Sequence, residues 1–209
     1  MERVYVLASG NQGKLKEIIA MLEPLGFSVR PQSDWGVPEA DETAATFIEN
    51  ALLKARQAAK YTGLPSIADD SGLVVPALNG QPGIFSARYA GKDADDEANK
   101  RKLLAELRGV TGPGRHAYFI CAMVLVRAVD DPAPLMAIGR WHGHILEKPQ
   151  GHGGFGYDPL FGVSSTLAGN GRLSAAELSR EDKSRVSHRG RALRELVRQI
   201  REMDERPTA

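Results

Sequence analysis

Carboxylates and cations gather in different parts of this chain. Residues 31–53 hold no lysine or arginine, whereas residues 180–201 hold eight basic residues and three acidic ones. The carboxylates of the first stretch, with two more soon after it, are Asp34, Glu39, Asp41, Glu42, Glu49, Asp69 and Asp70. Magnesium takes one or two carboxylates and completes its shell with water and substrate phosphate oxygens. A carboxylate site together with a separate basic segment therefore suits a phosphate-bearing substrate bridged by a metal, although a solvated helix face explains most of the basic residues.

Asp69 and Asp70 are consecutive in a predicted strand. Neighbouring strand residues face opposite sides of the sheet, so only one of these two carboxylates can point into a given site.

The loop Ser9-Gly10-Asn11-Gln12-Gly13-Lys14 follows a predicted strand, Val4–Ala8, and precedes a helix with apolar residues at i, i+3, i+4 and i+7. Its backbone N–H groups and the helix N-terminus attract anions, and Lys14 adds a formal charge. It is not a Walker A loop, because Leu15 stands where that motif requires Ser or Thr. Phosphate binding is favoured, and a purely structural strand-to-helix turn is the alternative.

Residues 151–156 match G-x-G-x-x-G, but Pro159 prevents a helix from opening there, which excludes a dinucleotide fold. The loop offers Phe155 and Tyr157 as stacking surfaces and Asp158 as an acceptor, or its aromatic side chains pack in the core.

Histidines give weaker signals. His188 adjoins Arg189 near a predicted helix boundary and could be a base, a hydrogen-bond donor or a surface residue. His142, His144 and His152 lack a Cys or carboxylate partner at a recognised metal spacing, so structural or solvent roles are expected.

Composition limits the function classes. The 209 residues carry 27 Lys+Arg and 26 Asp+Glu, and this balance gives no reason to expect nucleic acid or an anionic membrane as partner. The longest apolar run, Ala117–Val126, is half the length of a membrane-spanning helix, which needs about 20 residues. A single cysteine, Cys121, fits a core position in a reducing compartment. We therefore expect a cytoplasmic protein.

The elements that must position these residues form an alternating pattern of strands and helices. Further strands are predicted at 27–30, at 67–78 with an interruption at 69–72, and as an antiparallel pair at 117–129 and 135–146; helices are predicted at 43–60, 95–108 and around Leu193–Ile200. This pattern indicates a mixed α/β protein of two lobes sharing a central substrate cleft. With no separable linker, residues 1–209 are expected to form one domain.

Six segments, taken together, resemble the inosine/xanthosine triphosphate pyrophosphatase family of Ham1 type over nearly the whole chain. They are Ala8–Lys14, Thr46–Ala51, Ala68–Gly72, Pro82–Tyr89, Gly153–Pro159 and Lys183 through Ser187–Gly190. The segment Ser164–Leu173 departs from the family pattern by being longer.

The resemblance implies a mixed, curved sheet flanked by helices, a homodimer, and magnesium-dependent hydrolysis of ITP, dITP, XTP and dXTP to the monophosphate and pyrophosphate. Glu42 and Asp70 match magnesium ligands, and Asp70 also matches the proton acceptor. Substrate contacts match Ser9, Gly10, Asn11, Gln12, Gly13, Lys14, Lys54, Ser71, Phe155, Gly156, Tyr157, Asp158, Lys183, His188 and Arg189.

Three other functions remain open at this stage. A Maf-like pyrophosphatase would act on modified pyrimidine or methylated nucleotides. A nucleic-acid-binding protein would use the basic residues 180–201. The near-neutral total charge argues against this function. A nucleotide-binding regulator would bind without catalysis, and the metal-type carboxylates disfavour it.

Overall fold

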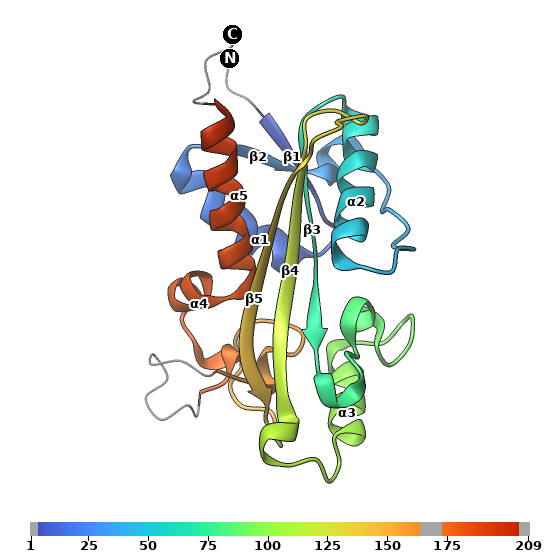
Figure 1. Cartoon of the computed structure of the whole chain (residues 1–209), viewed down its shortest axis with the longest axis vertical. Coiled ribbons are helices and arrows are strands. Elements are labelled where there is room, and N and C mark those ends of the chain that lie inside the picture. Colours follow the sequence, from blue (N-terminus) through green and yellow to red (C-terminus); the bar gives the residue numbers. More distant parts are fainter. Residues whose placement is uncertain (1–3, 164–172, 205–209) are drawn as a thin grey trace. The chain divides into compact units, whose positions relative to one another are not determined.

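The computed structural model describes residues 4–163 and 173–204, so most of the longer segment 164–173 lies outside the described residues. The strands are β1 (Val4–Ala8), β2 (Ser28–Pro31), β3 (Ser66–Val74), β4 (His116–Val126), β5 (Leu135–Ile145) and β6 (Phe161–Val163) (Figure 1). The helices are α1 (Gln12–Leu22), α2 (Phe47–Thr62), α3 (Asp96–Glu106), α4 (Arg180–Val186) and α5 (His188–Asp204).

The six strands form one sheet in the order β2-β1-β3-β4-β5-β6. β1 pairs in parallel with β2 and with β3, whereas β5 and β6 are antiparallel. Tyr118 contacts His142 and Phe119 contacts Trp141, so β4 and β5 run in opposite directions, as expected. The α/β class and the mixed sheet are confirmed.

The predicted interruption of β3 at residues 69–72 is wrong. The strand is continuous to Val74, with Leu73 and Val75 fully buried, and it ends where Pro76 begins a short 3-10 turn. Two adjacent acids are tolerated inside it because each meets a cation on its own face, as described below.

Helix α2 begins later than the predicted residue 43. Thr46 is the N-cap, its hydroxyl accepting the N–H of Glu49 at 3.3 Å and donating to the Glu49 carboxylate at 2.6 Å. This reciprocal cap sets the start at Phe47 and leaves Glu42 in the preceding loop.

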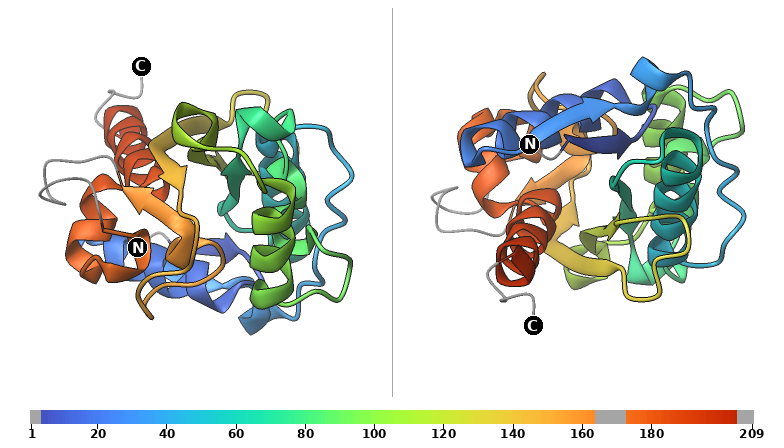
Figure 2. Two further views of the ribbon diagram at one scale, coloured as in Figure 1. Left: turned by 90° about the horizontal axis from the view of Figure 1, so that it is seen from below. Right: turned by 90° about the horizontal axis from the view of Figure 1, so that it is seen from above.

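Residues 1–70, 121–139 and 188–209 group into a first compact unit. Strand alternation divides its core in two: Leu7, Ile67 and Met123 pack against α1 and α5, whereas Val6, Ala68 and Val124 pack against α2. Helices α1 and α5 therefore cover one face of the sheet in this unit, and α2 covers the other (Figures 1 and 2). Cys121 is fully buried, as predicted for a core residue.

Residues 71–120 and 140–187 form a second compact unit. Its core centres on Phe161, whose ring lies 4.6 Å from that of Phe119 and 5.1 Å from that of Trp141, measured between centroids. The single domain and its central cleft stay predictions. No helix within residues 4–163 and 173–204 is long and apolar enough to cross a membrane.

Candidate active site

The loop after β1 leads directly into α1. The Asn11 side chain caps the helix by accepting the N–H of Lys14 at 3.0 Å, and the Ser9 hydroxyl accepts the N–H of Asn11 at 3.3 Å. Gly10, Asn11 and Gln12 are exposed, whereas Gly13 and Lys14 are half-buried. The first turn of α1 thus presents a positive helix end and a lysine, which is an arrangement that binds anions.

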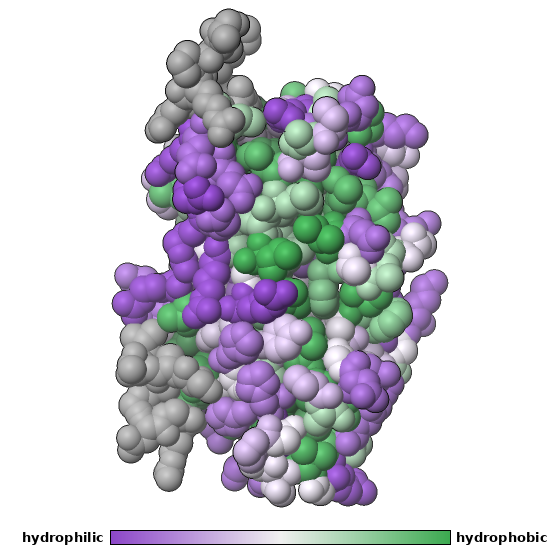
Figure 3. Space-filling model, viewed as in Figure 1, coloured by the Kyte–Doolittle hydropathy of each residue, from purple (hydrophilic) through white to green (hydrophobic). Residues whose placement is uncertain are grey.

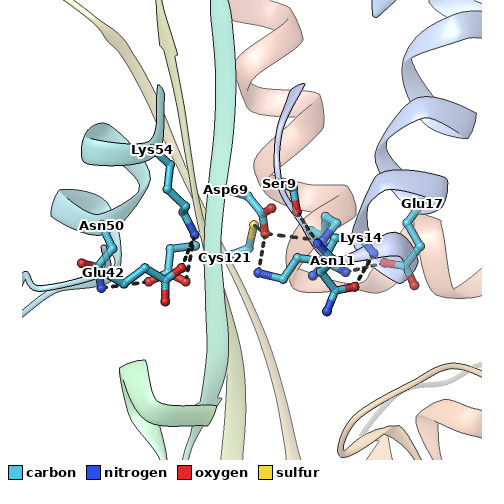
Figure 4. A network of polar contacts seen from close by, with 11 residues as sticks. Ser9, Asn11, Lys14, Glu17, Glu42, Asn50, Lys54, Asp69 and Cys121 are labelled. Carbon is cyan, nitrogen blue, oxygen red and sulfur yellow. Dashed lines mark hydrogen bonds and ion pairs between the residues drawn. The ribbon is translucent and has the colours of Figure 1, made fainter. Parts of the chain in front are cut away.

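One face of β3 carries Asp69, which is almost completely buried. Its Oδ2 atom lies 3.2 Å from Lys14 Nζ and 3.8 Å from Arg189 Nε, and it accepts a contact from the Cys121 thiol at 3.9 Å. Arg189 also forms an ion pair with Glu17 of α1. Figure 4 shows Lys14, Glu17 and Cys121 converging on this side of the strand.

These neighbours decide the ionisation of the buried groups. Burial opposes the charge on Asp69, but Lys14 and Arg189 outweigh it and hold the pKa of that carboxyl well below its usual range. Burial, reinforced by the charge of Asp69, raises the pKa of the Cys121 thiol. Asp69 is therefore a carboxylate, and Cys121 is a thiol and not a nucleophilic thiolate.

The other face of β3 carries Asp70. Its Oδ1 atom lies 3.5 Å from Lys54 Nζ, which contacts Glu42 Oε1 at 2.7 Å. Its Oδ2 atom accepts a hydrogen bond from the Asn50 side chain at 3.3 Å. In Figure 4 Glu42, Asn50 and Lys54 lie on the side of the strand opposite the Asp69 group. The prediction that the two acids point to opposite sides is confirmed.

Burial raises the pKa of Asp70, because the nearby ammonium of Lys54 offsets only part of the desolvation. Burial by itself would lower the pKa of Lys54, but the carboxylates of Asp70, Asp69 and Glu42 raise it. This face thus holds a protonated lysine between two acids, one of which has a greater than normal affinity for a proton.

Glu42 and Asp70 offer the oxygen donors that magnesium prefers. In the described part of the chain, no group of three or more His, Cys, Asp or Glu side chains could hold a metal ion. Magnesium needs only one or two protein carboxylates when substrate phosphates and waters complete its shell. Two carboxylates that already share one cation, Lys54, fit that requirement.

His188 and Arg189 begin α5, and both are buried. The helix reaches the sheet closely because residue 139 of β5 is glycine: a Cβ at that position would lie 2.0 Å from the His188 carbonyl oxygen and 2.7 Å from the Ala192 nitrogen. This close approach brings Arg189 beside Asp69.

Asp158 is the centre of a polar cluster in the second unit. Its Oδ2 atom accepts hydrogen bonds from Lys183 Nζ at 2.7 Å and from the backbone N–H of Phe155 at 2.9 Å. The Lys183 ammonium also lies 5.0 Å from the centroid of the Phe155 ring. Asp158 therefore fixes the loop and the lysine together.

Two further contacts hold the same loop. The N–H of Gly156 donates to Asp96 at 2.7 Å, and the Tyr157 hydroxyl donates to the Ser86 carbonyl at 3.0 Å. Tyr157 is buried in the core of this unit, whereas Phe155 is half-buried. The sequence left open whether these two rings stack on a ligand or pack in the core, and the Tyr157 ring packs in the core.

The predicted site residues are divided between the two units. The first unit contains Ser9 to Lys14, Glu42, Lys54, Asp70, His188 and Arg189; the second contains Ser71, Phe155 to Asp158 and Lys183. Sequence reasoning assigned no site role to Glu17, Asn50, Asp96 or Cys121, and it counted Asp69 among the carboxylates without giving it a role of its own. Asn50 carried a usable signal, because it is a polar residue on the buried face of α2.

Comparison with known proteins identifies the family. Residues 5–199 match the model of the Ham1 family. The chain belongs to the Ham1 family. The resemblance noted from the six sequence segments is therefore confirmed.

Ham1 relatives match the chain almost end to end. The dITP/XTP pyrophosphatase of Thioalkalivibrio sulfidiphilus is 53% identical over 195 residues, which are 93% of this chain and 97% of that protein. The dITP/XTP pyrophosphatase of Shigella flexneri is 53% identical over 201 residues, covering 96% of this chain and 99% of that protein. The structure of a HAM1 protein from Coxiella burnetii has a TM-score of 0.86 and 46% identity, covering 96% of this chain and 99% of that one.

Proposed function

We propose that this Ham1-family protein is a nucleoside triphosphate pyrophosphatase. It hydrolyses ITP, dITP, XTP and dXTP to the nucleoside monophosphate and pyrophosphate, and so removes noncanonical purines from the nucleotide pool. The observation that carries the proposal is the acidic face of β3, where Glu42 and Asp70 share one cation. The names of the similar curated proteins, dITP/XTP pyrophosphatase, support the substrate class.

The triphosphate is bound by residues 9–14. The exposed backbone of Gly10 to Gln12 and the start of α1 supply N–H groups, and the Lys14 ammonium supplies a charge. Charge builds on the leaving pyrophosphate during cleavage between the α and β phosphates. Prepositioned donors at this loop stabilise that charge.

Magnesium is the cofactor we infer, held by Glu42 and Asp70. When bound, it would neutralise phosphate charge and lower the pKa of a coordinated water. Lys54 lies between the same two carboxylates and contacts the substrate phosphates in this proposal.

Asp70 orients or deprotonates the attacking water. Its raised pKa suits a group that accepts a proton. Metal ligation and proton acceptance compete for the same two oxygens, and Asn50 Nδ2 donates to one of them. Asn50 therefore fixes the plane of the carboxylate, which leaves Oδ1 turned toward Lys54.

Selectivity depends on the six-position of the purine, where hypoxanthine and xanthine carry a carbonyl and adenine carries an amino group. Arg189, Lys183 or His188 donates to that carbonyl, and adenine would leave the donor unpaired. Such a site discriminates by roughly 10⁴ or more. The half-buried ring of Phe155 stacks on the base irrespective of the base's identity. The further substrate contacts are Ser71, Gly156, Tyr157 and Asp158.

We infer that the protein is a cytoplasmic homodimer. Figure 3 shows hydrophobic residues gathered on the surface over β4 and β5 of the first unit. Met136 and Ile138 of β5 are nearly half exposed. Ile138→Glu should convert the dimer to a monomer in sedimentation velocity, and a wild-type protein that sediments as a monomer would contradict the inference.

The deciding experiment is a panel of nucleoside triphosphates assayed with and without magnesium. ITP, dITP and XTP should release pyrophosphate and the monophosphate only when magnesium is present, with ATP and GTP far slower. The panel includes methylated and modified pyrimidine nucleotides, whose preferential cleavage would favour the Maf-like alternative. Nucleotide binding with no turnover would leave a regulator, and release of orthophosphate would contradict the proposed bond cleavage.

A further inference from the structure

Four charged side chains of the first unit form a run of alternating sign. Lys14 and Glu17 lie three residues apart on α1 and therefore on the same side of that helix. Asp69 comes from β3 and Arg189 from the start of α5. The run passes from Lys14 to Asp69, then to Arg189, and ends at Glu17.

This run is held away from water at its centre. The side chains of Asp69 and Arg189 are 0% and 2% exposed, whereas those of Lys14 and Glu17 are 15% and 29% exposed. Two cations and two carboxylates compensate one another in charge. Buried charges keep their geometry only when each has a partner, so the position of each cation depends on the shared Asp69 oxygen.

We propose that Asp69 is a positioning residue that couples Lys14 to Arg189, and that Glu17 fixes the guanidinium from its other side. The inference rests on the proposed function, in which Lys14 contacts phosphate and Arg189 contacts the base. Neither Asp69 nor Glu17 touches the reacting atoms in this scheme. Their role is to hold both cations in place before the substrate binds.

The physical reason is the shared carboxylate oxygen. Lys14 Nζ and Arg189 Nε lie 3.2 and 3.8 Å from the same Asp69 Oδ2 atom, so a displacement of either cation changes the field at the other. The planar guanidinium has donors on several edges, so it can bind Glu17 and Asp69 and still present a further donor to a carbonyl. Prepositioned side chains lower the ordering entropy lost on binding.

Two probes separate the phosphate end of the site from the base end. Tripolyphosphate has no base, and inosine has no phosphate. Their dissociation constants, measured by calorimetry on the full chain with magnesium, do not require turnover. A wild-type protein that binds both probes but cleaves no ITP would therefore contradict the proposed function while still testing the coupling.

Asp69→Asn keeps the size of the side chain and removes its charge. It should weaken binding of both probes about tenfold or more, the factor expected for one charged hydrogen bond. Glu17→Gln should weaken inosine about tenfold and lower the ITP-to-ATP ratio of kcat/KM. It should weaken tripolyphosphate by a smaller factor, because it reaches Lys14 only through Arg189 and Asp69. Glu17→Asp, which keeps the charge, should recover part of the inosine affinity.

Glu195→Gln is the matched control. Glu195 pairs with Arg198 on the exposed side of α5, the same helix that carries Arg189. Its substitution should change neither the inosine nor the tripolyphosphate dissociation constant. A role in packing alone would lower the melting temperature or the active fraction and leave the constants of the folded protein unchanged. That outcome for Asp69→Asn and Glu17→Gln would overturn the proposal.

Lys14→Gln gives a test that does not require Asp69→Asn to fold. If Asp69 couples the two cations, removing Lys14 should weaken inosine at least threefold even though Lys14 contacts only phosphate. Inosine affinity within twofold of the wild type would overturn the coupling.

Discussion

The two faces of β3 present consecutive aspartates to opposite kinds of environment. Asp69 shares one oxygen between Lys14 and Arg189, and its pKa is lowered. Asp70 lies beside Lys54, a cation that also pairs with Glu42, and its pKa is raised because burial outweighs the attraction of Lys54 and Lys14. Both side chains are buried in the same strand, so burial does not explain the contrast. The ratio of cations to carboxylates, which differs between the two faces, explains the opposite pKa shifts.

The contrast assigns different work to the two faces. A carboxylate with a strongly lowered pKa stays charged and accepts no proton, which suits holding cations in place. A carboxylate with a raised pKa, next to another carboxylate, suits accepting a proton or a metal ion. Alternation along one strand thus separates positioning from chemistry by a single residue.

Asp70→Asn should produce the largest change in activity. It removes the group proposed to orient the water and to bind magnesium, so ITP turnover should fall at least about 10³-fold, within the range for loss of a catalytic acid or base. Pyrophosphate release measures turnover, and circular dichroism checks the fold. Asp34→Asn, at an exposed ion pair with Arg30, should keep wild-type turnover. Near-normal turnover of Asp70→Asn would remove Asp70 from the mechanism.

Asp69→Asn and Asp70→Asn should change the free energy of unfolding in opposite directions. A carboxyl with a lowered folded-state pKa contributes stability above its unfolded pKa, and this is lost as pH falls through the folded pKa. Asp69→Asn should therefore destabilise the protein at pH 7, by about 3–5 kcal/mol as for a broken buried ion pair. A carboxyl with a raised folded-state pKa instead contributes stability below its unfolded pKa, which is lost as pH rises through the folded one.

Asp70→Asn should for that reason be at least as stable as the wild type at pH 7. The difference in unfolding free energy between this variant and the wild type should shrink as pH falls toward the unfolded-state pKa of aspartate. Urea unfolding at pH 7 and at lower pH values, without magnesium, measures both variants. Equal destabilisation of the two variants at pH 7 would break the comparison, because it would mean that the cations outweigh burial on both faces of the strand.

Much of this arrangement could be predicted from local signals. β1 has its predicted bounds and α3 lies within two residues of its predicted range, whereas α1 begins at Gln12, inside the predicted loop. Strand alternation separated Asp69 from Asp70 on the sequence alone. The continuity of β3 could not be predicted, because paired acids in a strand are unfavourable until cations from α1, α2 and α5 neutralise them.

The missed residues have the same physical explanation. Asp69 and Arg189 are 120 positions apart in sequence, and only the packing of α5 on β5 joins them. Glu17 looks like an ordinary polar residue of α1 until its partner is known. The six motifs identified the family from residue order, whereas the contacts between motifs required the fold.

Gly139→Ala should disturb the Asp69 face and spare the Asp70 face. The added Cβ would lie 2.0 Å from the His188 carbonyl, so the start of α5 must shift and carry Arg189 away from Asp69. Overpacking of this kind costs about 1–3 kcal/mol. KM for ITP should rise, and the ITP-to-ATP ratio of kcat/KM should narrow, because Arg189 would no longer be held where it can donate to the base carbonyl. Gly26→Ala has open space for its Cβ but a φ of +83°, so it strains the backbone without displacing α5; it controls for loss of stability alone and should leave the ITP-to-ATP ratio of kcat/KM unchanged.

Asn50→Ala is the matching disturbance of the Asp70 face. The Asn50 side chain accepts the N–H of Ala44 at 3.0 Å and donates to Asp70 at 3.3 Å, so it ties the loop that carries Glu42 to the proposed base. The variant leaves the Ala44 N–H without this partner, and loss of a buried hydrogen bond costs about 1–3 kcal/mol. Because the plane of the Asp70 carboxylate is released, kcat should fall about tenfold while the ITP-to-ATP ratio stays unchanged. A narrowed ratio with normal kcat would mean that the two faces are not separate in function, since the Asp70 side would then take part in recognition of the base.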